Sequence, residues 1–221
     1  MNATPNAMNR ITILIVAATA VIAGCSRPGI KGDGVSKTEQ RPISDFSALA
    51  VTGAYQIKWS SGKPAITIST DQNLLPLITA SVTGDTLHID RKENLRPTKG
   101  ITINVSSASL KEVRLNGAVS LTASKVFGPE LKLESNGASS VNVDGVVTNL
   151  EADFSGAGDL GAQALQTQAA RISLNGACSA DVTVTESLDA SISGAGVITY
   201  GGNPKTVEKN VSGVGKIQSR R

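Results

Sequence analysis

Asp159 and Asp181 are the side chains whose spacing comes nearest to a catalytic arrangement. They follow Gly156 and Gly176 by three and five residues in neighbouring sequence repeats, which would place both carboxylates on one outer surface. Paired carboxylates can carry out glycoside hydrolysis or bind Ca²⁺ weakly. The same pattern is typical of solvated surface acids, and we favour that second interpretation.

The other reactive residue types are too few for the common catalytic sites. His88 is the only histidine, so a zinc cluster is excluded and a Ser-His-Asp triad would have to use it. It lies between Leu87 and Ile89 in an alternating, strand-like segment, which favours a structural or surface position. The Ser-Gly-Ala-Gly runs at Ser155 and Ser193 precede strands rather than helices, unlike phosphate loops. We therefore expect a non-enzymatic protein without catalytic, metal or cofactor sites.

The two cysteines have different expected roles. Arg10 precedes an apolar run of 14 residues, Ile11 to Gly24, which is shorter than the roughly 20 that span a bilayer and is typical of a signal peptide. The run ends in Ile22-Ala23-Gly24-Cys25, which resembles the lipobox of bacterial lipoproteins, so residues 1–24 would be removed and Cys25 lipidated. Cys178 then has no partner for a disulfide, and we expect it to be buried and inert.

Lipidation at Cys25 predicts a membrane-anchored protein. Each buried acyl methylene contributes about 0.8 kcal/mol, and more than one acyl chain, such as palmitate, gives stable attachment. Ser26, rather than Asp, follows the cysteine, and by resemblance to Gram-negative lipoprotein sorting this implies the outer membrane. The sequence does not indicate which leaflet the protein faces. Either Met1 or Met8 can be the start of the chain. Residues 25–40 are rich in Gly, Ser and Lys and predict a flexible tether before a domain at 41–221.

A glycine repeat indicates which elements position these residues. Asn/Ser-Gly-Ala/Val triplets recur at intervals of 20, 19, 20, 18 and 19 residues, with apolar residues two positions before and four after most of the glycines. A period of this length indicates stacked coils that bury a shared core, and the alternation within each coil indicates short strands. We predict an all-β parallel β-helix, or solenoid, with about 18–20 residues per coil, clearest over residues 110–221. The repeat glycines are Gly53, Gly117, Gly137, Gly156, Gly176, Gly194 and Gly213.

An N-terminal mixed β region interrupts the repeat. Phe46 to Trp59, around Gly53, has apolar residues at the same offsets as the later coils and predicts a related coil. The strands expected between the two parts are 65–70, 80–83, 86–90 and 101–105, with Gly84-Asp85 as a hairpin turn and only 71–78 able to form a short helix. These strands would cap or flank the stack.

Two outward columns of side chains follow from stacking. The residue before each repeat glycine from Gly117 onward is Asn or Ser. These side chains either form a hydrogen-bonded ladder at the corner or contact a ligand, and we favour the ladder. Five residues before the glycines, charges alternate in sign through the first five repeats, and the alternation fails between the last two residues of the column, Asp189 and Glu208. The five alternating residues are Glu112, Lys132, Glu151, Arg171 and Asp189. Parallel, in-register coils would favour this alternation.

The composition excludes a nucleic-acid binder and fits an exported β-protein. The formal net charge is only +3, with 22 glycines and 3% aromatic residues. Nucleic-acid-binding domains instead concentrate basic residues on one face.

The entry sequence carries a family resemblance. From Gly32 to the C-terminus, the sequence resembles the auto-transporter adhesin head GIN domain family. The resemblance is carried by Gly32-Asp33-Gly34-Val35, then Arg41-Pro42-Ile43 and Phe46, a strand into Gly53 and the later Ser/Asn-Gly-Ala corners. The resemblance implies a bacterial, exported protein, often a lipoprotein, with a right-handed β-helical fold and no established activity. An auto-transporter would also carry a membrane barrel, which this sequence lacks, so the adhesin comparison extends only to the head.

We expect a lipid-anchored, non-catalytic binding or adhesion module for a glycan, envelope polymer or protein. The alternatives are a carbohydrate-active enzyme that uses Asp159 and Asp181, and a homo-oligomeric envelope component assembled through exposed coil ends.

Overall fold

The protein is all-β in the part that the structure, a computed structural model, describes, residues 29–220. The only helical element there is a short 3₁₀ helix, η1 (Leu75–Leu77). The expected signal peptide, Cys25 and Ser26 lie outside the described residues. The strands are β1 (Ile30–Lys31), β2 (Ser36–Arg41), β3 (Ala48–Ser61), β4 (Ala65–Asp71), β5 (Ile78–Thr83), β6 (Thr86–Arg91), β7 (Leu95–Arg96), β8 (Thr102–Ser107), β9 (Glu112–Gly201) and β10 (Thr206–Ser219).

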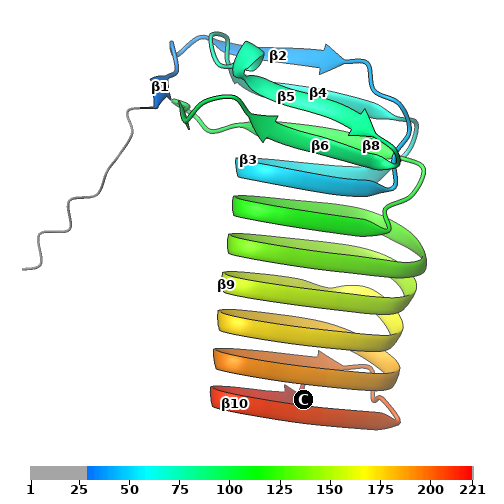
Figure 1. The fold of residues 1–221 in the computed structure, drawn as a ribbon. Coiled ribbons are helices and arrows are strands. Elements are labelled where there is room, and N and C mark those ends of the chain that lie inside the picture. Colours follow the sequence, from blue (N-terminus) through cyan, green and yellow to red (C-terminus); the bar gives the residue numbers. More distant parts are fainter. Residues whose placement is uncertain (1–28, 221) are drawn as a thin grey trace, which may run out of the picture.

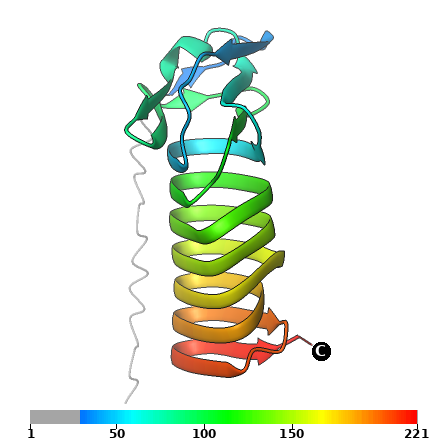
Figure 2. The ribbon, with the colours of Figure 1, turned by 90° about the vertical axis from the view of Figure 1, so that its right-hand side faces the viewer.

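The long strand β9 winds round as a stack of coils between β3 and β10 (Figures 1 and 2). Its first turn pairs with β3 in parallel, and its last turn pairs in parallel with β10. The register places Gly117 on Gly53 and Gly213 on Gly194. Each coil therefore sits on the next with corresponding residues in contact.

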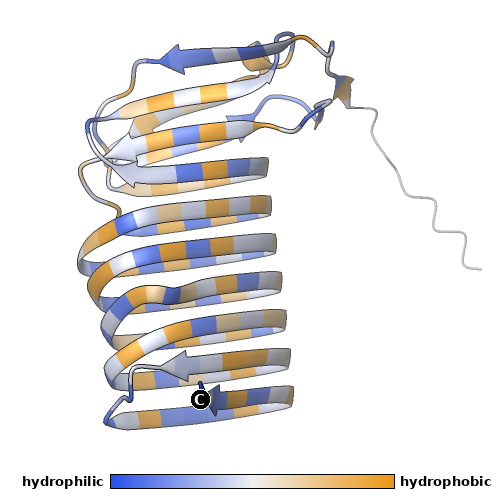
Figure 3. Ribbon diagram, turned by 180° about the vertical axis from the view of Figure 1, so that it is seen from behind, coloured by the Kyte–Doolittle hydropathy of each residue, from blue (hydrophilic) through white to orange (hydrophobic). Residues whose placement is uncertain are grey.

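The core lies inside the coils, where the two predicted apolar columns point. Phe154, Leu174 and Ile192 are buried two residues before their glycines, and Figure 3 shows the resulting alternation of apolar and polar residues along the ribbon. Ser135, the polar residue in this column, is also buried, and its hydroxyl forms a short hydrogen bond with the Ser139 hydroxyl. Each hydroxyl thus satisfies the other, which allows a polar pair inside an apolar stack.

The N-terminal strands cover the β3 end of the stack, as the sequence predicted (Figure 1). Both β6 and β8 pair in parallel with β3, while β5 pairs with β6, and β4 with β8, in antiparallel fashion. The turn between β5 and β6 contains Gly84 with a φ of 62°. Of the helix considered possible at 71–78, only η1 forms, and Pro76 lies in its first turn. The cap therefore pairs residues 48–51 and 56–61 of β3 on the side opposite β9.

The predicted tether of residues 25–40 is too long. Residues 36–40 belong to β2, which pairs antiparallel with β4 at the edge of the sheet. The sequence Ser-Lys-Thr-Glu-Gln-Arg has no apolar alternation because most of this edge strand is exposed on both faces. Arg41 fixes the end of β2 by donating to the carbonyl oxygens of Ile78 (2.6 Å) and Leu75 (2.7 Å).

Asp71 is expected to make the fold sensitive to acid. Its buried carboxylate accepts hydrogen bonds from the Thr98 hydroxyl (2.6 Å), the Thr98 amide (2.8 Å) and the Gly34 amide (2.9 Å). The two Thr98 bonds, and then the Gly34 bond, hold the pKa of Asp71 below its ordinary value of 3.8. A depressed folded-state pKa contributes stability above the unfolded pKa, and this contribution is lost as the pH falls through the folded pKa.

Melting curves of the wild type and of Asp71→Asn between pH 7 and pH 2 test this expectation. The variant should melt at a lower temperature at pH 7, and the difference should shrink below about pH 4, where the wild-type carboxylate also takes up a proton. A constant difference across that range would show that Asp71 contributes by packing alone.

Candidate functional site

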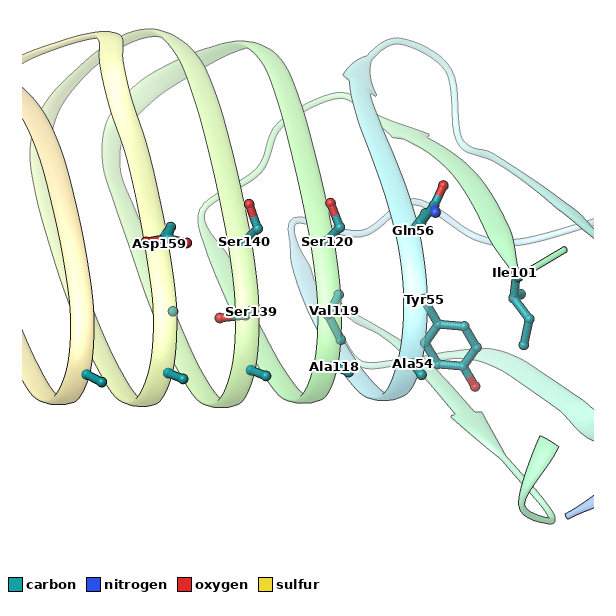
Figure 4. A pocket seen from close by; sticks show the side chains of 15 residues that line it. Ala54, Tyr55, Gln56, Ile101, Ala118, Val119, Ser120, Ser139, Ser140 and Asp159 are labelled. Atoms are coloured by element: carbon teal, nitrogen blue, oxygen red, sulfur yellow. The ribbon is translucent and has the colours of Figure 1, made fainter. Parts of the chain in front are cut away.

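A shallow groove of about 550 Å³ runs along the stack, across successive coils beside the glycine corner (Figure 4). Its floor is a row of small side chains, one from each coil, and a parallel row of hydroxyl, amide and carboxyl groups lines one side. The floor residues are Ala54, Ala118, Ala138, Ala157 and Ala177, and the polar row is Gln56, Ser120, Ser140 and Asp159. Because every coil contributes the same positions, the groove repeats along its length and suits an extended ligand.

The stacked glycines set the shape of the corner beside this groove. Gly156 has a φ of 106°, and a Cβ atom there would lie 2.5 Å from the carbonyl oxygen of Gly137. Gly176 has the same relation to Gly156, at 2.4 Å. Only glycine combines this backbone conformation with such close approach, so the coils meet at this corner without any side chain between them.

The Asn/Ser column borders the alanine floor and is exposed except at Ser155, which is partly buried. Asn116, Asn136 and Asn175 are exposed, and the hydrogen bonds among residues 29–220 include none from these side chains. The expected ladder is therefore not formed. The corner backbone does not need the amides, because residues such as Asn116 and Thr52 already pair between coils. The amides are left as donors and acceptors beside the groove, which favours the ligand-contact interpretation.

Tyr55 ends the groove and also caps the glycine column. A Cβ atom on Gly53 would lie 2.6 Å from Cε2 of Tyr55, so the ring covers Gly53 where another coil would otherwise stack. The ring is only 4% exposed, and among the described residues its hydroxyl has no hydrogen-bond partner. Burial raises the pKa of Tyr55 to about 12, with a smaller lowering by Arg91. Sequence analysis missed this role because Tyr55 occupies an ordinary inward position.

The two aspartates considered as an alternative catalytic pair have separate partners. Asp159 accepts a hydrogen bond of 2.5 Å from the Ser179 hydroxyl, whereas Asp181 forms an ion pair with Arg220. Within residues 29–220 the two carboxyl groups share no hydrogen-bond partner. His88 is exposed on β6, away from both. In the same part of the chain, no three His, Cys, Asp or Glu side chains are grouped as metal ligands would be.

The comparisons with known proteins decide the family. The family model described as "Putative auto-transporter adhesin, head GIN domain" matches residues 45–204. The chain belongs to this family. No curated protein matches the sequence. Within residues 29–220, the structure has no helix of the length and apolar character that crossing a membrane requires.

Solved structures similar to this head GIN domain share its fold at low sequence identity. A putative adhesin from Bacteroides fragilis has a TM-score of 0.74 at 21% identity, covering 87% of this chain and all of that one. A putative lipid binding protein from Parabacteroides distasonis scores 0.53 at 23% identity, covering 87% and 99%. A putative adhesin from Parabacteroides merdae scores 0.52 at 20% identity, with the same coverage. These names describe adhesion and lipid binding, not catalysis.

The charged column of the head GIN domain forms ion pairs on the outside of the coils. Arg171 lies 3.5 Å from Asp189, its neighbour in the predicted column. Lys132 instead contacts Glu134 at 2.8 Å, two residues along its own coil, and that bond raises the pKa of Lys132 and lowers that of Glu134. Glu112 and Glu151 add smaller increases to the Lys132 pKa, as expected for neighbours in a stacked column.

Cys178 is buried, as predicted, and is expected to resist thiol reagents in the folded protein. Burial raises the pKa of its thiol, and the thiolate is the reactive form. In a Cys25→Ser chain, where Cys178 is the only thiol, labelling by a disulfide reagent at pH 8 should be about a hundredfold slower in buffer than in urea. Equal rates would show that this coil is open in the native state.

Proposed function

We propose that this head GIN domain is a non-catalytic binding module of the bacterial cell envelope, which holds an extended polymer, glycan or polypeptide, along the groove beside its glycine corner. In this proposal the chain is a right-handed β-solenoid whose coils repeat one binding unit. The observation that carries it is the row of exposed amides on Asn116, Asn136 and Asn175, two residues before alanines of the floor, which have no hydrogen-bond partner within residues 29–220.

The chemistry of the groove supports binding rather than turnover. Small side chains let a ligand backbone approach the coils closely, and the exposed amides and hydroxyls provide both donors and acceptors. Asp159 is the one carboxylate among the described lining residues and is hydrogen-bonded to Ser179, so the lining does not supply the pair of carboxyl groups that glycoside hydrolysis requires. Repetition along the coils would add many weak contacts, which suits adhesion to a polymer.

The proposed location is the outer membrane, through a lipid on Cys25 after removal of residues 1–24. The lipobox-like Ile22-Ala23-Gly24-Cys25 and the following Ser26 support this location. β1 and β2 lie in the cap over β3, so the anchor would join the protein at the capped end. The stack would then extend from that end.

A polysaccharide and protein array tests the groove. The purified chain is applied to immobilised polysaccharides and to outer-membrane proteins, and each polysaccharide spot is followed for loss of polymer. We expect retained, undegraded signal, which Ala138→Trp and Ala157→Trp reduce at least about tenfold because the indole fills the groove.

Ala164→Trp is the matched control, since Ala164 is exposed on β9 but does not line the groove. Binding that is equally strong in Ala157→Trp would exclude the groove as the site. Loss of polymer with time would instead support the carbohydrate-active enzyme.

A further inference from the structure

Phe127 is the most exposed aromatic side chain of the described residues. It is 79% exposed, whereas Phe46 and Phe154 are 2% and 1% exposed. Val146 is 50% exposed and lines the same hollow. Phe127 and Val146 thus place an exposed aromatic ring and an exposed apolar side chain in the lining of one hollow, which makes this hollow a candidate binding site.

The backbone around Phe127 is held in an unusual conformation. Lys125 has a positive φ of 58°, and its amide donates to the Asp144 carboxylate of the next coil at 2.6 Å. Gly145 also has a positive φ, 134°, and a Cβ there would lie 2.0 Å from the carbonyl oxygen of Val126. The two coils therefore meet tightly just before Phe127, and this corner fixes the orientation of the chain that presents the ring.

Phe127 forms one wall of a hollow of about 490 Å³ whose lining carries no charged residue. This volume lies within the range of small-ligand sites, about 300–1,000 Å³. Thr148, Gln166 and Gln168 line the hollow, are exposed, and make no side-chain hydrogen bond within residues 29–220. The hollow thus combines an aromatic face with free amide and hydroxyl groups.

We propose that this hollow, hereafter the Phe127 hollow, binds a neutral saccharide of about two or three sugar units. The negative face of an aromatic ring attracts the weakly positive C–H groups on one face of a pyranose. The glutamine amides and the Thr148 hydroxyl would bind the sugar hydroxyl groups as donors and acceptors. The absence of charge in the lining disfavours phosphorylated, sulfated or uronic acid ligands.

The same features argue against a membrane-binding patch. Segments that enter the lipid interface combine several apolar side chains with basic residues. The Phe127 hollow instead places Gln166, Gln168 and Thr148 beside the ring, and these groups would lose hydrogen bonds to water in lipid. None of its lining residues lines the groove, so this site does not rest on the function proposed there.

Nuclear magnetic resonance of the ¹⁵N-labelled chain tests the Phe127 hollow directly. The probes are cellotriose, maltotriose, xylotriose, mannotriose and chitotriose, with trigalacturonate as a charged comparison. We expect at least one neutral trisaccharide, and not trigalacturonate, to shift the side-chain amide signals of Gln166 and Gln168. Phe127→Ala should weaken that binding about tenfold, Phe127→Tyr should retain it, and Gln168→Ala should weaken it several-fold.

Val214→Ala is the control, since Val214 is 85% exposed at the other end of the stack, and it should bind as the wild type does. The proposal is overturned if no neutral trisaccharide shifts the glutamine signals, or if Phe127→Ala binds normally. It is also overturned if neutral phosphatidylcholine vesicles, rather than sugars, perturb them. Ala157→Trp, which fills the groove, should leave trisaccharide binding to the Phe127 hollow intact. The two binding proposals can therefore be rejected independently of each other.

Discussion

Gly156→Ala is expected to destabilise the protein by about 3 kcal/mol or more. The substitution places a Cβ atom 2.5 Å from the Gly137 carbonyl oxygen and requires alanine to adopt a φ of 106°. Neither problem can be relieved by a rotamer change, because the opposing atom belongs to the backbone. The coils would have to separate at the corner, where their parallel pairing holds them together.

Two other glycines separate the causes of this effect. Gly84→Ala tests positive φ alone, since a Cβ there meets nothing within 4 Å, and should cost about 1–2 kcal/mol. Gly62→Ala, with Ser106 Cβ at 3.7 Å and no positive φ, should be nearly neutral. Urea midpoints measure all three, and a Gly156→Ala midpoint equal to that of Gly84→Ala would contradict the steric explanation.

Hydrogen exchange should locate the damage in Gly156→Ala. Coils in a stack contact only their neighbours, so a break at one interface weakens the coils beyond it more than the capped ones. We expect faster exchange in residues 157–219 than in β3, β6 and β8. Uniform acceleration over all strands would show that the stack and its cap unfold as a single unit.

Phe154→Ala is expected to cost about 3–5 kcal/mol. Phe154 is 1% exposed, and its inward ring shares a column with Ser135 and Leu174, which cannot fill the space it would leave. Because the Cys178 thiol lies 3.9 Å from the Phe154 carbonyl oxygen, the cavity should also open the surroundings of Cys178. Urea unfolding and the rate of thiol labelling should therefore change together.

Phe127→Ala is the matched control for Phe154→Ala, since it removes the same side chain from a position that is 79% exposed. Its free energy of unfolding should stay within about 0.5 kcal/mol of the wild type. A Phe154→Ala loss below about 1 kcal/mol would mean that neighbouring coils collapse into the cavity.

The glycine period predicted the stack because two physical requirements fall on one residue. Positive φ and contact between backbones both require glycine, so a column such as Gly137, Gly156 and Gly176 leaves a regular trace in the sequence. The cap strands were predictable for a related reason, since β6 and β8 each bury alternate residues in the hydrophobic core.

The features that sequence analysis missed lack such a trace. β2 is exposed on both faces at the sheet edge, so its pairing with β4 depends on backbone groups that every residue possesses. The sequence could not show whether the Asn136 side chain is exposed without a hydrogen bond or belongs to a hydrogen-bonded ladder, because asparagine is suited to both positions. The Phe127 hollow was invisible because Gly145 and Lys125 form its corner only once and establish no period.

Because glycine stacks on glycine in every coil, one coil can be removed or added as a unit. The length of the groove is therefore set by the number of coils. Removing residues 157–176 would join Gly156 to Ala177, restore an intact Ser-Gly-Ala triplet and shorten the floor by one alanine. Duplicating the same segment would lengthen the floor by one. The length of the groove can thus change in whole coils, without redesign of the corners or of the cap.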